Sequence, residues 1–395
     1  MGTGHHRRRT RCSEIKHNRG ALMNHRERLL TALERGKPDR LPATIHGWMD
    51  YWSNKYMGGA DQFEIYRHFD MDAQIFYFAW LDEPPVEAMY FTGDLVPGPN
   101  WRVSYQIAKS DRVSTVYKFT IETPEGVLTK TMEKNDKMAW VTEYPIKQKE
   151  QIHWVRKYMP LPRPDIQRIN QAFEQMGDMG ILRAGIFNHQ GGCWQDACNY
   201  VGSQQLIMAT FDDPAWVHEF LRIILDYKLK FIESLRGARI DMLENGGGDG
   251  SMSVISPAVF AEYCVPYDRI TTAALHDIGI KTVYHTCGKM MAQLDLIRQI
   301  GCDASETLTP RGMGGDADLR QIKATLGGEM ALIGGFNQQA GFERGTPETI
   351  RRQIETCWEQ AAPGGGYIMA ASDHFFEGDP ENIRTYVEIA KEFRY

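Results

Sequence analysis

The chain has 395 residues, of which 42% are hydrophobic and 24% are charged, as in an ordinary globular protein. Its net charge of −6 argues against a surface for nucleic acid or anionic membranes, and no stretch reaches the apolar length of a membrane span. The seven cysteines are odd in number and scattered, which argues against a disulfide framework and indicates a reducing cytoplasm.

The N-terminal 22 residues contain a basic run and no hydrophobic period, so we expect a disordered tail at 1–22 and one globular unit at 23–395. Asn24 is a suitable N-cap for a helix over 25–35, which Gly36 and Pro38 end. A strand at 41–45, a helix at 61–68 and a second buried strand at 72–78 follow.

The stretch from about 93 to 147 has a different pattern. It is rich in Val, Thr, Tyr and Ile with polar alternation, and Pro124-Glu125-Gly126 within it is a turn signal. We therefore predict an antiparallel β-insertion over about 93–147.

From residue 164 onward, predicted helices and strands alternate. The helices cover 164–176, 203–211, 213–235, 257–277 with a break or bend at Pro266, 290–300, 318–326, 347–360 and 380–393. The strands cover 180–187, 240–244, 281–285, 303–308, 330–336 and 366–371. With the two earlier strands, this alternation predicts an α/β fold, a (β/α)8 TIM barrel carrying the β-insertion.

In such a barrel the chemistry lies at the C-terminal ends of the strands, and polar side chains gather there in this sequence. The strand ends carry His46 and Trp48, Asn188 and Gln190, Glu244 and Asp249, His285 and Cys287, Glu306, Asn337, and Asp373 and His374. We expect these residues to surround one site.

His285 and Cys287 end their strand two residues apart, so both side chains can point at one ion. An imidazole beside a thiolate suits zinc best, although a packed histidine with a structural cysteine is the alternative for so short a motif. Glu244, Asp373 and His374 are the further donors that neighbouring strands offer. A mixed ligand set with one open position is the catalytic kind of zinc site and suits transfer of a one-carbon group.

Other strand-end residues are candidates for catalysis and substrate binding. Asp249 is a candidate acid or base, or a cap for the segment that follows, and His46 is the second catalytic candidate. The predicted substrate-binding residues are Trp48, Asn188, Gln190, Trp194, Glu306 and Asn337. The glycine run before Asp249 lacks the patterns of phosphate-binding and dinucleotide-binding loops, so we expect a flexible loop there.

Several segments resemble the uroporphyrinogen decarboxylase and corrinoid methyltransferase superfamily. They are Arg26–Pro42, Ile255-Ser-Pro257 with the segment 263–267, His285-Thr-Cys287-Gly288, and the segment 365–368 with the helix start at 379–382. The resemblance covers about residues 24–395 and implies a TIM barrel, in agreement with the strand count.

The superfamily contains two chemistries. Its decarboxylases carry an arginine-rich motif after the first strand that grips the substrate's carboxylates, whereas His46-Gly47-Trp48-Met49 stands at that place here. Its methyltransferase branch carries a zinc site built from H-x-C and a later cysteine. His285 and Cys287 match the first two ligands, but Ser372-Asp373-His374 stands where the later cysteine belongs. The resemblance therefore implies the methyltransferase branch, with Asp or His as a replacement ligand or with a changed or lost metal.

We expect a cytoplasmic, zinc-dependent methyltransferase that moves a methyl group between a small methyl ether or thiol and a corrinoid (cobalamin) carried by a partner protein. The demethylating direction is slightly favoured, because an oxygen or nitrogen third ligand leaves zinc the stronger Lewis acid. The alternatives are a uroporphyrinogen decarboxylase-like decarboxylase and a non-catalytic tetrapyrrole-binding protein. A homodimer is compatible with the sequence, and we expect no nucleic-acid or membrane partner. We expect the insertion to cover part of the barrel mouth.

Overall fold

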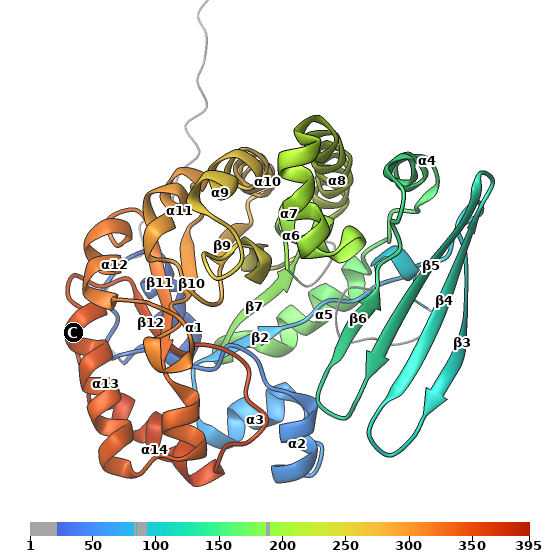
Figure 1. Ribbon diagram of the computed structural model, residues 1–395. Coiled ribbons are helices and arrows are strands. Elements are labelled where there is room, and N and C mark those ends of the chain that lie inside the picture. The colour runs from blue at the N-terminus through green and yellow to red at the C-terminus, as the bar shows by residue number, and fades with distance from the viewer. Residues whose placement is uncertain (1–21, 83, 85–92, 187–189) are drawn as a thin grey trace, which may run out of the picture.

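The computed structural model describes residues 22–82, 84, 93–186 and 190–395. The predicted tail at 1–22 lies outside these ranges except for its last residue. Eight parallel strands form the central sheet in the order β1-β12-β11-β10-β9-β8-β7-β2. They are β1 (Ala43–Thr44), β2 (Ala73–Phe76), β7 (Gly180–Gly185), β8 (Met242–Gly246), β9 (Lys281–His285), β10 (Ala304–Thr307), β11 (Ala331–Phe336) and β12 (Tyr367–Ala371). Helices surround this sheet (Figure 1), which confirms the predicted (β/α)8 barrel.

The helices follow the predicted alternation, with three additions. They are α1 (His25–Leu33), α2 (Asp50–Tyr56), α3 (Gln62–Phe69), α4 (Ile152–Tyr158), α5 (Ile166–Met176), α6 (Cys193–Val201), α7 (Ser203–Asp212), α8 (Pro214–Ser234), α9 (Pro257–Tyr263), α10 (Val265–Asp277), α11 (Leu294–Ile300), α12 (Leu319–Leu326), α13 (Pro347–Ala361) and α14 (Pro380–Ala390). The sequence predicted no helix at α2, α4 or α6. In the described part of the chain, no helix combines the length and apolarity that crossing a membrane requires.

Two helix boundaries follow directly from local chemistry. The Asn24 side chain accepts a hydrogen bond from the Glu27 N–H, and the Glu27 side chain accepts one from the Asn24 N–H, so α1 begins at a complete capping box. The helix predicted over 257–277 is divided at Cys264 into α9 and α10. Pro266 lies in the first turn of α10, where its missing N–H costs no intrahelical hydrogen bond.

The barrel is closed between β1 and β2, the two ends of the strand order. The Asp72 N–H donates to the Ala43 carbonyl at 3.2 Å, and the Ala43 N–H donates to the Asp72 carboxylate at 3.0 Å. The Tyr66 hydroxyl lies 3.2 Å from the Ile45 carbonyl and 3.1 Å from the Gln74 carbonyl. One carboxylate and one phenol thus replace the ladder that such short strands cannot provide.

The Asp72 carboxylate is buried and surrounded by cations. Arg28 and Arg40 donate to it at 2.7 and 2.9 Å, and a ring nitrogen of His25 lies 2.9 Å away. Burial alone would raise the pKa of Asp72, but the hydrogen bond with His25 and the charges of Arg40 and Arg28 outweigh it. The pKa of Asp72 therefore lies well below its ordinary value.

We expect Asp72→Asn to lower the free energy of unfolding at pH 7 by about 3–5 kcal/mol, because it leaves two arginines facing a neutral amide. A carboxyl group whose pKa is lower in the folded state stabilises the fold at any pH above its pKa in the unfolded state, which is about 3.9. This stability is lost as the pH falls from there through the pKa of the folded state. The difference between wild type and variant should therefore shrink as the pH falls below about 4. Urea unfolding at pH 7 and at pH 3 measures both effects.

The control for this prediction is Asp70→Asn. The Asp70 side chain is 71% exposed and pairs with Lys391 on the surface. Its loss should cost about 1 kcal/mol or less. Equal losses in the two variants would contradict the role of Asp72 in closing the barrel.

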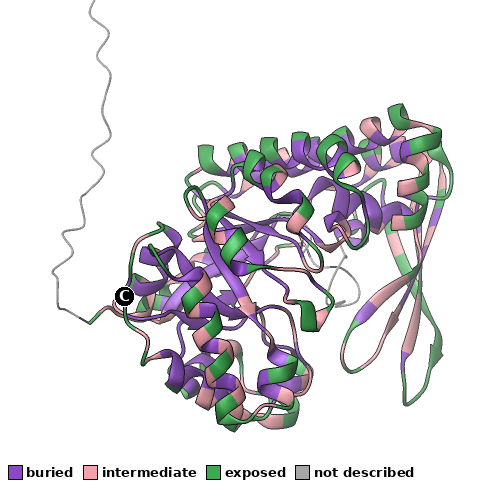
Figure 2. Cartoon of the chain, turned by 60° about the vertical axis from the view of Figure 1, so that its left-hand side comes forward, coloured by how far each residue is buried: buried purple, intermediate pink, exposed green. Residues whose placement is uncertain are grey.

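The insertion forms a separate antiparallel sheet in the order β3-β4-β5-β6. Its strands are β3 (Arg102–Ser110), β4 (Thr115–Thr123), β5 (Gly126–Lys134) and β6 (Ala139–Glu143), and the sheet stands beside the barrel (Figure 1). Strands β4 and β5 contribute buried side chains such as Phe119 and Leu128, whereas the outer strand β3 is almost entirely exposed (Figure 2).

One ion pair lies within the insertion, and one lysine of the insertion contacts the barrel. The buried Lys130 ammonium of β5 lies 2.8 Å from the Asp94 carboxylate, which precedes the insertion strands. At the turn between β5 and β6, the Lys137 ammonium lies 4.8 Å from the ring centre of Tyr51 and 5.8 Å from that of Phe376. Tyr51 belongs to α2 after β1, and Phe376 follows β12. The insertion thus reaches the segments that follow two of the barrel strands.

Candidate functional site

Four buried side chains bring their donor atoms together where the barrel strands end. They are His46, Glu244, His285 and Glu306, and their donor atoms all lie within 4.8 Å of one another. His46 follows β1, Glu244 lies on β8, and His285 and Glu306 are direct partners in the β9–β10 register. This four-residue cluster is the candidate functional site.

Arg183 of β7 holds the two carboxylates of the cluster in place. It donates to the Glu306 carboxylate at 2.8 and 2.6 Å, and to Glu244 Oε2 at 2.6 Å. Its side chain is fully buried. Arg183 is not among the predicted site residues, although an arginine inside a buried strand, between Leu182 and Ala184, indicates that carboxylates lie opposite it.

The buried charges of the cluster balance one another. Burial would raise the pKa of Glu306, but the charges of Arg183 and His46 and the hydrogen bond from His285 lower it well below the ordinary value. Burial would lower the pKa of His285, but the charge of Glu244 and hydrogen bonds with Cys287 and Glu306 raise it well above the ordinary value. Two carboxylates therefore face Arg183 and favour the protonated form of His285, which would give up its proton on binding a metal.

One carboxylate oxygen in this cluster is left over. Glu244 Oε1 is buried and has no hydrogen-bond partner within the described ranges, and it lies 3.5 Å from His285 Nδ1. A buried carboxylate oxygen without a hydrogen bond is costly, and a metal cation at this point would satisfy it. With the two imidazoles, it offers the nitrogen and oxygen donors that zinc accepts. Arg183 already occupies both oxygens of Glu306, so Glu244 is the better carboxylate ligand.

Cys287 and His374 lie beside the cluster. Cys287 forms a hydrogen bond with His285, and a Cβ built on Gly248 would lie 2.7 Å from the Cys287 sulfur. The His374 ring centre is 5.0 Å from that of His46, which is in turn 5.2 Å from that of His285. Burial and the neighbouring charge of His46 lower the pKa of His374 to about 4, so its ring is neutral at pH 7.

Asp373 and Asp249, the other two acidic residues predicted for the site, form hydrogen bonds outside the four-residue cluster. The Asp373 carboxylate accepts the N–H of its own neighbour, His374, at 2.7 Å. The Asp249 carboxylate accepts hydrogen bonds from Gln195 of α6 at 2.8 Å and Ser203 of α7 at 2.6 Å. Both of its oxygens are thus engaged with the helix layer, because the turn Gly248–Gly250 carries Asp249 away from the strand end. Neither residue belongs to the four-residue cluster.

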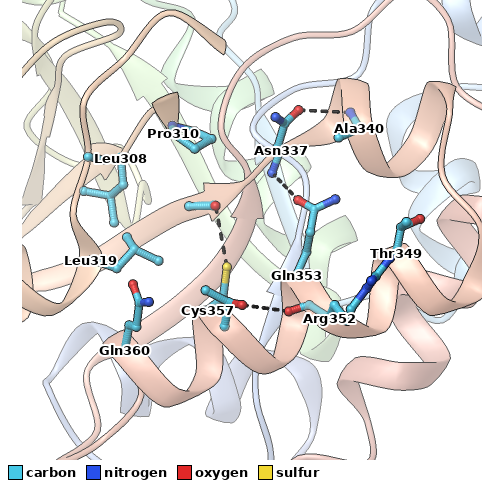
Figure 3. Close-up of a pocket in the computed structure, with 13 residues that line it drawn as sticks. Leu308, Pro310, Leu319, Asn337, Ala340, Thr349, Arg352, Gln353, Cys357 and Gln360 are labelled. Carbon is cyan, nitrogen blue, oxygen red and sulfur yellow. Dashed lines mark hydrogen bonds between the residues drawn. The ribbon is translucent and has the colours of Figure 1, made fainter. Parts of the chain in front are cut away.

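The predicted substrate-binding residues are dispersed. Trp48 is buried among Trp52, Tyr66, Phe69 and Phe375, so it belongs to an aromatic core. Trp194 is buried and donates to the Asp249 carbonyl, and Gln190 accepts the Gly248 N–H. Asn337 lines a separate cavity against α13 (Figure 3). Glu306 is in the cluster. Asn188 lies outside the described residues.

Comparisons with known proteins place the chain among relatives of two chemistries. A family model described as uroporphyrinogen decarboxylase (URO-D) matches residues 24–393. A uroporphyrinogen decarboxylase of Pseudoalteromonas translucida is 25% identical over 189 residues, covering 46% of this chain and 50% of that protein. A methylcobamide:CoM methyltransferase of Methanosarcina mazei is 24% identical over 165 residues, covering 39% of this chain and 44% of that protein. The chain thus matches half or less of each of these curated relatives.

The overall fold is also that of a solved structure. A methyltransferase from Methanosarcina mazei superimposes with a TM-score of 0.66 and 13% sequence identity, over 94% of this chain and 99% of that chain. At this identity the likeness concerns the fold alone. It extends over nearly the whole length of both chains.

Proposed function

The chain belongs to the uroporphyrinogen decarboxylase family, and on that premise we propose that it is a zinc-dependent methyltransferase. The methyl group moves between a small methyl ether or thiol and a corrinoid carried by a partner protein, in the demethylating direction by preference. The observation that supports this most is the buried Glu244 Oε1, which lacks a hydrogen-bond partner in the described ranges and lies among imidazole donors.

The residues that would hold the metal are His285, Glu244 and His46, whose donor atoms lie within 4.8 Å of one another. Cys287, which is hydrogen-bonded to His285, is the sulfur ligand within reach. When bound there, zinc supplies Lewis acidity towards an ether oxygen or lowers the pKa of a thiol.

The protein's own groups prepare this site. Arg183 fixes the orientation of Glu244 and Glu306, so the carboxylates do not need to reorganise. The neutral ring of His374 lies beside His46 and can accept or donate a hydrogen bond without adding charge. Burial of the whole cluster keeps competing water out. The donors are mostly oxygen and nitrogen, which supports the demethylating direction, because they leave zinc more Lewis acidic than thiolates do.

The corrinoid partner is proposed from the relatives. One of them is named a methylcobamide:CoM methyltransferase. The β-insertion reaches the segments after β1 and β12 through Lys137, so it is positioned to contact a domain that docks over the barrel mouth.

A decarboxylase is the second candidate, favoured by the relative of that name. Decarboxylation of a porphyrinogen requires cationic groups that grip several carboxylates. Arg183 is already engaged by two glutamates, and the segment after β1 offers His46 rather than arginines. These two observations favour the methyltransferase.

The decisive assay incubates the zinc-loaded full chain with cob(I)alamin and a panel of aryl methyl ethers and methylated thiols. We expect methylcobalamin to form, and its absorbance measures the reaction. His285→Ala should abolish this formation. Turnover of uroporphyrinogen with no methyl transfer would instead establish the decarboxylase. Binding of a tetrapyrrole without either reaction would establish a non-catalytic binding protein.

A further inference from the structure

A cavity of about 490 Å³ lies between the ends of β10 and β11 and the outer helix α13 (Figure 3). The segment after β10 contributes Leu308, Pro310 and Ala317, and α12 contributes Leu319. The rest of the wall comes from the end of β11, the segment after it, and one face of α13. A volume of several hundred Å³ suits a small organic ligand.

The charge of the cavity wall has one sign. Arg352 is the only charged residue among the described residues that line it, and no aspartate or glutamate does so. Arg352 is exposed and forms no ion pair within the described ranges, although the charge of Glu348, one turn earlier on α13, interacts with it. Its neighbour Arg351, by contrast, donates to both oxygens of Glu392 at 2.9 and 2.8 Å, away from the cavity. An anionic group entering the cavity would therefore meet the positive charge of Arg352, and no carboxylate lines the wall beside it.

Two carboxamides add further donors. The Gln353 side-chain oxygen accepts the Asn337 N–H at 3.1 Å, and the Asn337 side-chain oxygen accepts the Ala340 N–H at 3.0 Å. Each oxygen is thus occupied by the backbone, which leaves the amino group of each side chain. In the part of the chain that the structure describes, these amino groups have no hydrogen-bond partner. They can donate to an acceptor in the cavity.

The opposite wall is apolar and uncharged. Leu308 and Leu319 are buried there. The thiol of Cys357 is hydrogen-bonded to the Gly335 carbonyl at 3.5 Å. Burial raises the pKa of Cys357 to about 11, so the thiol carries no charge at pH 7. The cavity therefore has a donor-rich rim and an apolar floor.

We propose that this cavity binds an organic monocarboxylate with a compact apolar body. Arg352, Asn337 and Gln353 hold the carboxylate, and the wall around Leu308 and Leu319 packs against the apolar part. None of the four residues of the cluster lines the cavity, so this ligand is distinct from the molecule that reacts at the cluster. The proposal does not depend on methyl transfer.

The test is calorimetric titration of the full chain with phenylbutyrate, and with the neutral phenylbutyramide as the matched ligand. We expect saturable binding of phenylbutyrate and binding at least about tenfold weaker for the amide, because charge-assisted hydrogen bonds are lost. Arg352→Gln should weaken phenylbutyrate binding by a similar factor, whereas Arg351→Gln, which removes the same charge outside the cavity, should leave it unchanged. Thr356→Trp, at an exposed position on the cavity wall, should abolish binding by filling the space.

Three results would overturn the proposal. They are the absence of saturable binding, equal weakening by Arg351→Gln and Arg352→Gln, and binding that survives in Thr356→Trp. The two arginines are on the surface of α13, so their substitution leaves the core intact, and a failure of binding in Arg352→Gln alone is not a failure to fold. Methyl transfer at the cluster is measured separately, so either proposal can fail without the other.

Discussion

Replacement of Arg183 by methionine is expected to lower the free energy of unfolding by about 3–5 kcal/mol at pH 7. The arginine is fully buried and donates to both glutamates of the cluster. Its loss leaves two buried carboxylates with too little positive charge, and the methionine fills the space without compensating them. Urea unfolding monitored by circular dichroism measures the loss, which should be smaller at pH 5, where the carboxylates can take up protons.

Two further variants separate this effect from the loss of any arginine. Arg236→Met removes an exposed arginine paired with Glu233, and it should cost about 1 kcal/mol or less. Adding Glu306→Gln to Arg183→Met should recover part of the stability, because it removes one of the unbalanced charges. If Arg183→Met cost no more than Arg236→Met, the cluster would not depend on this buried cation.

The eight barrel strands could be predicted because parallel strands are buried on both faces and are bounded by turn residues. Strand 281–285 was predicted with its observed limits, whereas 41–45 is reduced to the two residues of β1. This strand is short because Asp72 and Tyr66, and not a regular ladder, hold the adjoining backbone. Such side-chain contacts between distant residues leave no periodic signal in the sequence.

Helix α6 was not predicted for a related reason. Eight of its nine residues are buried, so it shows no contrast between a polar and an apolar face. Sequence periodicity detects helices that lie on the surface of a core, and α6 lies inside one. The helices α2 and α4 are short, with seven residues each, and give little periodicity to detect.

The location of the site could be predicted, but the partners of each side chain could not. The strand assignment placed His46, Glu244, His285 and Glu306 at one end of the barrel, where the structure also brings them together. It could not distinguish Glu244, which points into the barrel, from Asp249, whose carboxylate is held by Gln195 and Ser203. Only four residues lie between them, and Asp249 belongs to the turn Gly248–Gly250 that follows the strand. The ligand roles stay predictions.

Removal of the Glu244 carboxylate or the His285 imidazole should reduce the affinity for zinc by more than about 100-fold. Even the loss of a residue that only hydrogen-bonds to a metal ligand reduces metal affinity by up to about that factor. The variants are Glu244→Gln, which keeps the shape of the side chain, and His285→Ala. Zinc affinity is measured by competition with a chelator, and cobalt(II) absorption reports the donor set. Cys287→Ser should remove the sulfur-to-cobalt band if the thiolate is a ligand. Asp249→Asn, whose carboxylate contacts α6 and α7, should leave affinity unchanged.

Two glycines of one loop supply a pair of variants in which no donor residue is replaced. Gly248→Ala puts a methyl group where it would lie 2.7 Å from the Cys287 sulfur, so the thiol must shift from its position beside His285. At Gly250 the same methyl group would meet Phe260 and Cys264 only at 3.8 and 3.9 Å, which is ordinary packing distance. We therefore expect Gly248→Ala to weaken zinc binding and shift the cobalt spectrum, and Gly250→Ala to do neither. Unchanged zinc affinity in both Glu244→Gln and His285→Ala would remove the metal from the proposed function, because no other group in the described ranges brings three such donors together.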